Sequence, residues 1–92
     1  MTKIFITYEA APDPERYAQH VELCRKVPGA TFRHGPVFGT PAHEQRFFYY
    51  AEFEFPDRDA FNAAVRTPEL RATGEDAQAL GVPHTVHFAE LA

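Results

Sequence analysis

The sequence has one cysteine, no tryptophan and no long hydrophobic run. A single thiol, Cys24, excludes an intramolecular disulfide and the multi-thiolate zinc and iron–sulfur sites. No apolar stretch approaches the ~20 residues that span a bilayer, and the N-terminal residues show no signal-peptide pattern. These absences predict a cytoplasmic protein with no part in a membrane.

Basic side chains are scarce as well. Nine Lys and Arg stand against 13 Asp and Glu, which gives a net charge of −4 with histidine neutral. The closest approach to a basic run is Arg25-Lys26, which is too short to form an electrostatic footprint for a phosphate backbone. We therefore expect neither nucleic acid nor an anionic membrane surface as a partner.

Aromatic residues, in contrast, are abundant, with 9 Phe and 4 Tyr among 92 residues. The length suits a single domain, 1–92, with one core. A compact chain of this length is expected to expose roughly 5,400 Å² of surface. The predicted fold therefore has to account for where these aromatic side chains lie.

The first half of the chain shows a strand, a helix and a weaker strand. Alternating apolar residues predict a strand over 3–9. Asp13 followed by Pro14 begins a helix that Pro28-Gly29 ends. A second strand over 30–38 is interrupted by Gly35-Pro36, which places it at a sheet edge or a bulge.

The second half begins with a loop over 39–44 and the most strand-like stretch, 45–55. Asp57 and Thr67 each cap a stretch of helix, and the last strand covers 84–90. The order of elements is therefore strand, helix, strand, strand, helix, strand. This order predicts an α+β, ferredoxin-like βαββαβ fold, a four-stranded antiparallel sheet with the helices on one face.

Side-chain alternation divides the aromatic residues between the two faces of this sheet. The face toward the helices is predicted to carry Phe47, Tyr49, Phe53 and Phe55. The open face is predicted to carry Phe5, Phe48 and Tyr50. Left uncovered, the open-face patch would be large for a monomer, so we expect a homodimer that packs through the open face.

Four segments carry a resemblance to a known family. They are Asp13-Pro14-Glu15 with Tyr17; residues 20–29, a histidine followed by an Arg-Lys-aliphatic-Pro-Gly helix end; residues 51–55; and Thr67-Pro68-Glu69 with Gly81-Val82. In order and spacing these segments resemble the EthD-like family of the dimeric α/β-barrel superfamily, over nearly the full length. Members commonly carry a second histidine one helical turn before the position of His20, where this chain has Arg16 and Tyr17.

The resemblance implies a dimeric α/β barrel that takes part in small-molecule metabolism. Relatives act as isomerases, cyclases or cofactor-independent oxygenases, so the implied ligand is a small apolar or aromatic metabolite. The alternative is a non-catalytic binding or stress-associated module whose own Phe and Tyr side chains fill the pocket. Haem binding, as in distant relatives of the barrel, would require an axial histidine that faces an open cavity, and His20 is the candidate.

His20 is the leading candidate for chemistry. It lies on the apolar stripe of the first helix, so it should point under the sheet with Tyr17 and Cys24. A histidine there can act as general acid or base near neutral pH. The plainer interpretation is a hydrogen-bonded histidine at the edge of the stripe.

Tyr8, Tyr49 and Phe47 are the candidate substrate-binding residues. All three fall on the sheet face assigned to the helices, where the two hydroxyls can reach His20 or a ligand carbonyl. Their rings would line an apolar pocket with few polar groups. Taken singly, each residue is better explained by core packing.

The spacing of the remaining histidines predicts no metal site. His84 and His87 should face opposite sides of one strand, and His43 beside Glu44 has no partner at ligand spacing. We therefore predict neither a metal nor a cofactor. Glu52 and Glu54 share a strand face and are interpreted as interface or lumen charges rather than an acid/base pair.

Overall fold

A computed structural model of the chain describes residues 1–42 and 44–92. His43, which the sequence places in a loop, lies outside the described residues. The described residues form β1 (Thr2–Tyr8), α1 (Pro14–Cys24), β2 (Thr31–Pro36), β3 (Tyr49–Phe55), α2 (Arg58–Ala64), α3 (Pro68–Ala79) and β4 (His84–Glu90). The predicted ferredoxin-like order is confirmed, with the second helical region divided into α2 and α3.

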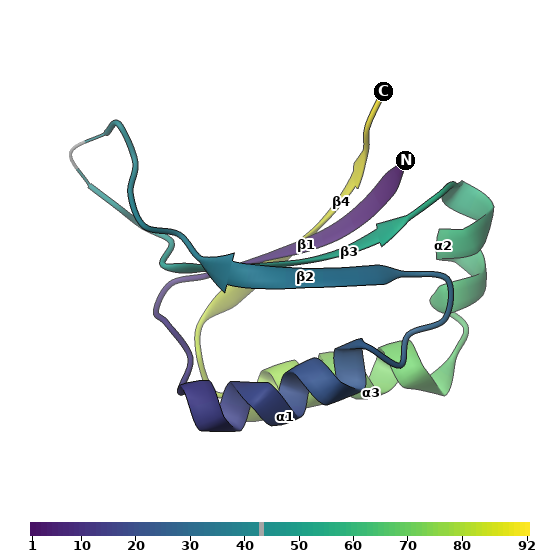
Figure 1. The fold of residues 1–92 in the computed structure, drawn as a ribbon, viewed down its shortest axis with the longest axis horizontal. Coiled ribbons are helices and arrows are strands. Elements are labelled where there is room, and N and C mark those ends of the chain that lie inside the picture. The colour runs from purple at the N-terminus through teal and green to yellow at the C-terminus, as the bar shows by residue number, and fades with distance from the viewer. Residues whose placement is uncertain (43) are drawn as a thin grey trace.

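The strands form one antiparallel sheet in the order β2-β3-β1-β4. α1 and α3 lie along one face of this sheet, α2 lies at one end, and the other face is open (Figure 1). β2 is an edge strand, one of the two placements that Gly35-Pro36 predicts, because proline has no backbone N–H to donate to a neighbouring strand. The sheet thus has a helix face and an open face.

Side-chain caps fix where the three helices begin. Asp13, Asp57 and Thr67 each accept a hydrogen bond from the backbone N–H three residues further on, at 2.9, 2.8 and 3.2 Å. Such a cap stabilises a helix by about 1 kcal/mol because it satisfies a donor that has no partner within the helix. Beyond α1 the chain turns at Gly29, whose φ of 76° suits glycine. These local signals hold α1 in place under the sheet.

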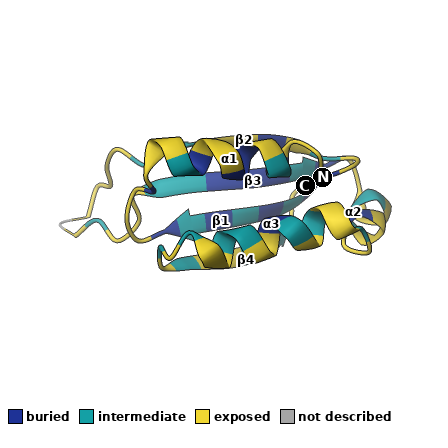
Figure 2. Ribbon diagram, turned by 90° about the horizontal axis from the view of Figure 1, so that it is seen from below, coloured by how far each residue is buried: buried dark blue, intermediate teal, exposed yellow. Residues whose placement is uncertain are grey.

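The core lies between the helix face of the sheet and the helices. The sides of α1 and α3 that face the sheet are more buried than their outer sides (Figure 2). The largest fully buried side chains are Tyr8, Phe55 and Cys24. Burial of a side chain of this kind contributes about 1.5–3 kcal/mol to folding.

The start of β3 differs from the prediction. The strand begins at Tyr49 rather than at residue 45, because its ladder with β2 ends at the pair Pro36 and Tyr49. Just before the strand, the side-chain amide of Gln45 donates to the carbonyls of Val37 and Phe47, at 2.7 and 2.9 Å. The predicted core placement of Phe47 is therefore wrong, since 38% of the residue is exposed.

Residues 37–42 and 44–48 form an arm that projects beyond the sheet (Figure 1). Phe38, on this arm, is fully exposed. None of the described helices is long and apolar enough to cross a membrane.

Candidate functional site

A cavity of about 200 Å³ lies between the helix face of the sheet and α3. Its walls are mainly apolar, with Ile4, Ile6 and Phe53 from the sheet and Leu70 from α3. His20 and Tyr8 also line it and bring polar atoms to an otherwise apolar space. A concave apolar site with a few polar groups is the usual character of a small-ligand site. We call it the His20 cavity.

His20 reaches this cavity from α1 and is held there by an acid on α3. The residue is 4% exposed, and its Nδ1 lies 2.8 Å from Oδ2 of Asp76. The Arg16 guanidinium binds both oxygens of the same carboxylate, at 2.6 Å to Oδ1 and 3.2 Å to Oδ2. Arg16, His20 and Asp76 are here called the His20 cluster.

The helices explain this geometry. Arg16 and His20 are four residues apart on α1, so both side chains lie on one face, toward α3. Gly74 and Ala77, beside Asp76 on α3, line the cavity and present little bulk to it. The carboxylate therefore meets the histidine and the guanidinium from across the interface between the two helices.

The His20 cluster sets the charge of each member. The pKa of Asp76 is lowered, chiefly by the hydrogen bond from Arg16 and further by His20. The pKa of His20 is lowered by burial, and the Asp76 carboxylate offsets only part of that effect. At neutral pH Asp76 is therefore ionised and His20 is neutral.

A neutral histidine has one ring proton, and Asp76 determines where it sits. An ionised carboxylate can only accept, so we assign the proton to Nδ1, which donates to Asp76. Nε2 receives no hydrogen bond from any residue in 1–42 and 44–92. Every fully buried side-chain nitrogen and oxygen in those residues has a partner. Nε2 must therefore keep some accessible surface, and its lone pair is free.

Tyr8 stands at the same cavity with its hydroxyl already in a hydrogen bond. It is 1% exposed, and its hydroxyl lies 3.3 Å from that of Tyr17. Burial raises the pKa of Tyr8, so the phenol stays protonated. The hydroxyl can accept from Tyr17 and donate to a ligand oxygen.

The two other predicted substrate-binding residues lie elsewhere. Tyr49 lines a separate groove on another flank of α1 and makes a 2.6 Å hydrogen bond to Nδ1 of His34. Phe47 precedes β3 and lines neither the groove nor the His20 cavity. The structure therefore brings together His20 and Tyr8, and it leaves Tyr49 and Phe47 apart from them.

Asp76 is the member of the site that the sequence did not reveal. It lies 56 residues from His20 along the chain. Its neighbours on α3 include Gly74 and Ala77, and an acid among such small residues on the inner side of a helix is a weak signal for a buried partner. The partner of this acid can be identified only from the packing of α1 on α3, which the sequence does not show.

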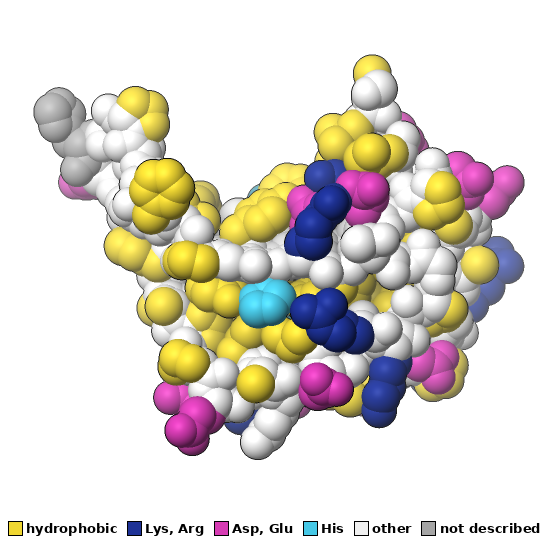
Figure 3. All heavy atoms as spheres, viewed as in Figure 1, with side chains coloured by type: hydrophobic (Ala, Val, Ile, Leu, Met, Phe, Trp, Pro, Cys, Tyr) yellow, Lys and Arg dark blue, Asp and Glu magenta, His cyan; other side chains and the backbone are white. Residues whose placement is uncertain are grey.

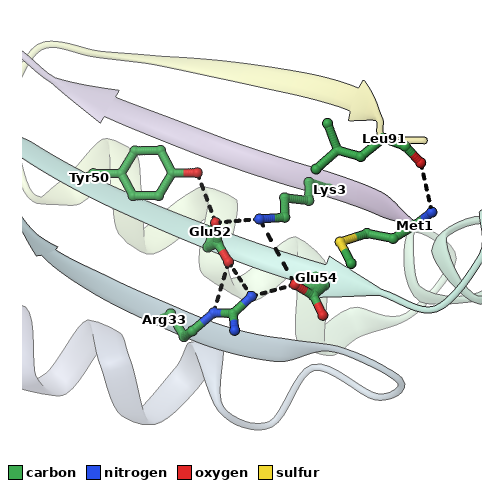
Figure 4. Close-up of polar contacts among 7 residues, drawn as sticks. All are labelled: Met1, Lys3, Arg33, Tyr50, Glu52, Glu54 and Leu91. Atoms are coloured by element: carbon green, nitrogen blue, oxygen red, sulfur yellow. Dashed lines mark hydrogen bonds and ion pairs between the residues drawn. The ribbon is translucent and has the colours of Figure 1, made fainter.

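The open face holds a second paired carboxylate, Glu52, which is buried at 6% exposure (Figure 4). Its Oε1 accepts from Lys3 Nζ and from the Tyr50 hydroxyl, each at 2.9 Å. Arg33 donates to Oε2 from Nη2 at 2.6 Å and from Nε at 2.9 Å, and it also binds Glu54. We call Lys3, Arg33, Tyr50, Glu52 and Glu54 the open-face cluster. Both Glu52 and Glu54 are thus paired with Lys3 and Arg33.

Burial alone would raise the pKa of Glu52, but the hydrogen bonds from Lys3, Tyr50 and Arg33 outweigh it and leave the pKa lowered. Beside the cluster, the Phe5 ring stacks on His87 with centroids 4.6 Å apart. His84 faces the helix side, near Tyr8. The predicted opposite orientation of His84 and His87 is confirmed.

Solved structures with this fold cover the whole chain. An EthD (ethyl tert-butyl ether D) family protein from Bacillus halodurans is 27% identical, covers 100% of this chain and 99% of that one, and has a TM-score of 0.82. A dimeric ferredoxin-like protein of unknown function from Jannaschia is 20% identical, covers 98% of each chain and has a TM-score of 0.74. A hydroxynitrile lyase from Passiflora edulis is 12% identical, covers 99% of this chain and 93% of that one, and has a TM-score of 0.75.

These likenesses define the class as ferredoxin-like α+β proteins. Within that class the resemblance predicted from the sequence is confirmed, and the chain has the fold of the EthD-like dimeric α/β barrels. No family model and no curated protein sequence matches the chain.

Proposed function

We propose that the protein binds a small apolar or aromatic metabolite in the His20 cavity and that His20 acts on it as an acid/base. The reaction would be that of an isomerase, a cyclase or a cofactor-independent oxygenase. One observation carries the proposal: a buried, neutral histidine lines an apolar cavity, with Nδ1 fixed by Asp76 and Nε2 without a hydrogen-bond partner among the described residues. The hydroxynitrile lyase of similar fold supports small-molecule chemistry on this scaffold.

The first step would be proton removal from a carbon next to a carbonyl. The Nε2 lone pair takes the proton, and the electron pair of the broken C–H bond moves toward the carbonyl oxygen. The imidazolium that forms is stabilised by the ionised Asp76, which is in turn paired with Arg16. Tyr8, which lines the same cavity, would donate a hydrogen bond to the oxygen that gains charge. Return of the proton to another carbon completes an isomerisation.

The dimensions of the cavity point to a small ligand. Sites for drug-sized ligands usually measure about 300–1,000 Å³, and the His20 cavity measures about 200 Å³. A compound with one ring suits that space. The open space beside His20 also argues against a pocket filled by the protein's own Phe and Tyr side chains, the form in which we expected a non-catalytic module.

We also propose that the working unit is a homodimer through the open face. Phe48 is 41% exposed there, beside the partly exposed rings of Phe5 and Tyr50. The single chain exposes 5951 Å², against roughly 5,400 Å² for a compact monomer of its size. A similar structure is described as dimeric, which supports this assignment.

The cytoplasm is the proposed location. Cys24 is a free, buried thiol, and burial raises its pKa to about 12. A chain whose one thiol is free rather than in a disulfide suits a reducing compartment.

Deuterium exchange of acetophenone tests the catalytic proposal. In D2O the protein should accelerate exchange of the methyl protons next to the carbonyl, saturably, as followed by NMR. His20→Gln should abolish the acceleration, and His34→Gln should retain it because His34 lies outside the cavity.

Saturable binding of acetophenone to the His20 cavity without exchange would favour the non-catalytic binding module. If acetophenone neither binds nor exchanges its methyl protons, the proposal is contradicted.

A further inference from the structure

A second hollow lies between α1 and the edge strand β2, on a different flank of α1 from the His20 cavity. It has a volume of about 420 Å³, and its apolar wall includes Pro12, Pro14 and Ala18. A histidine side chain and cationic side-chain atoms lie beside the hydrophobic surface between β2 and α1 (Figure 3). We call this hollow the His34 groove. Tyr17 separates it from Tyr8 and the His20 cavity.

The groove stays open because β2 ends early. On the helix face of β2, Phe32 is buried, but His34 is followed on that face only by Pro36, the last residue of the strand. No large side chain of β2 therefore fills the space above Ala18.

His34 and Tyr49 give the groove a fixed hydrogen-bond donor. The Tyr49 hydroxyl lies 2.6 Å from Nδ1 of His34. Burial raises the pKa of Tyr49, so the phenol keeps its proton and donates it to Nδ1. Burial, followed by the charge of Arg25, lowers the pKa of His34, so the ring is neutral. A neutral ring that accepts at Nδ1 carries its proton on Nε2, which is left to donate.

Two opposite charges line the same groove. Arg25 follows the last residue of α1, and no salt bridge joins it to a residue in the described part of the chain. Glu22, one turn earlier on α1, is the acid that lines the groove. An anionic ligand would be attracted by Arg25 and repelled by Glu22.

We propose that the His34 groove binds a small aromatic carboxylate. The carboxylate would accept from the Arg25 guanidinium and from Nε2–H of His34, while the ring packs on Pro12, Pro14 and Ala18. Charge-assisted hydrogen bonds to a planar carboxylate are the interactions that guanidinium forms best. This site is separate from the His20 cavity and does not depend on the proposed reaction.

An NMR titration with phenylacetate tests this proposal on the intact protein, with phenylacetamide as the neutral control of the same shape. Phenylacetate should shift the amide signals of Ala18, Val21 and His34 saturably, and it should leave those of Val86 and Ala77, at the His20 cavity, in place. Phenylacetamide should bind more weakly.

Two charge variants should change the affinity for phenylacetate in opposite directions. Arg25→Gln should weaken phenylacetate binding roughly fivefold or more, because a charged hydrogen bond is lost. Glu22→Gln should tighten it about twofold, because a repulsive charge on an exposed helix is removed. Both side chains are exposed, so neither variant threatens the fold.

Absence of saturable shifts in the groove up to millimolar phenylacetate would overturn the proposal. Equal affinity of the wild type and Arg25→Gln would overturn it as well. Acetophenone exchange at His20 does not enter either outcome, so the two proposals succeed or fail separately.

Discussion

Asp76 and Glu52 are two carboxylates on opposite sides of one sheet, and each binds two basic side chains. Asp76, on the helix side, pairs with Arg16 and His20. Glu52, on the open face, pairs with Lys3 and Arg33. The difference lies in these basic partners, because histidine titrates near neutral pH and is neutral at His20, whereas lysine and arginine stay charged.

Because of this difference, we assign different roles to the Asp76 and Glu52 clusters. At Asp76 the titratable partner lines a cavity and has an Nε2 without a hydrogen-bond partner among the described residues, which is why we propose proton transfer there. At Glu52 the carboxylate accepts from Lys3, Tyr50 and Arg33, on the face that we propose a second copy covers. A buried carboxylate with cations is thus a site for proton transfer only where one partner titrates and borders a space for ligand.

The largest expected effect comes from removal of the titratable partner. His20→Gln should reduce the acetophenone exchange rate by about 10²–10⁴-fold, the usual contribution of a general base. His87→Gln, which changes a histidine on the open face, should leave the rate unchanged. Equal losses in both variants would place the chemistry elsewhere.

The next effect concerns which face a second copy covers. Phe48→Glu should weaken the dimer by about 100-fold or more, since it places like charges in an apolar interface. Sedimentation or light scattering across a concentration series would measure the shift toward monomer. The matched variant is Phe88→Glu, because Phe88 is 69% exposed but on the helix side of the sheet. If only Phe88→Glu dissociates the dimer, the open face is not the interface.

Neutralising each carboxylate compares the two clusters directly. Glu52→Gln should lower the free energy of unfolding by about 1–3 kcal/mol, because it removes the negative charge that two cations share and replaces one acceptor oxygen by an NH2 group at a well-buried position. Asp76→Asn should cost less, since the Asp76 side chain is 19% exposed against 8% for that of Glu52. Urea denaturation of both variants measures the difference, and a larger loss for Asp76→Asn would reverse our ranking.

The smallest effect is the pH dependence of stability. The pKa of His20 is below its ordinary 6.5 in the folded protein, so below pH 6.5 the unfolded chain binds a proton that the folded chain resists. Stability should therefore fall as the pH drops from 7.5 to 5.5. His34 acts in the same direction, since its pKa is lowered too.

Urea midpoints at the two pH values would measure this loss. His20→Gln should flatten the change more than His34→Gln does, because His20 is buried and His34 is exposed. The Asp76 and Glu52 carboxylates stay ionised in this range, since both pKa values are lowered. Identical slopes in the wild type and His20→Gln would show that His20 is not held in its neutral form.

The sequence predicted those parts of the fold that depend on local interactions. The helix starts are an example, because each cap accepts a hydrogen bond from a backbone N–H only three residues further along the chain. Neighbouring residues therefore sufficed to place the caps Asp13, Asp57 and Thr67. The start of β3 was misplaced because it depends on the pairing partner at Pro36, more than ten residues away.

The candidate site shows the same limit. The apolar stripe of α1 was enough to place His20 under the sheet, but Asp76 reaches it only through the packing of α1 on α3. Strand alternation put Tyr8 and Tyr49 on the same face, as observed. It did not show that α1 divides the space under that face into a cavity and a groove.

Nitrogen NMR of the His20 ring tests the central claim most directly and needs no ligand. With labelled protein at pH 7.5, our assignment predicts a neutral ring with its proton on Nδ1 and a pKa below 6.5, lowered further in Asp76→Asn. A proton on Nε2, or an imidazolium that persists at pH 7.5, would contradict the account, because Nε2 would then have no lone pair with which to act as a base.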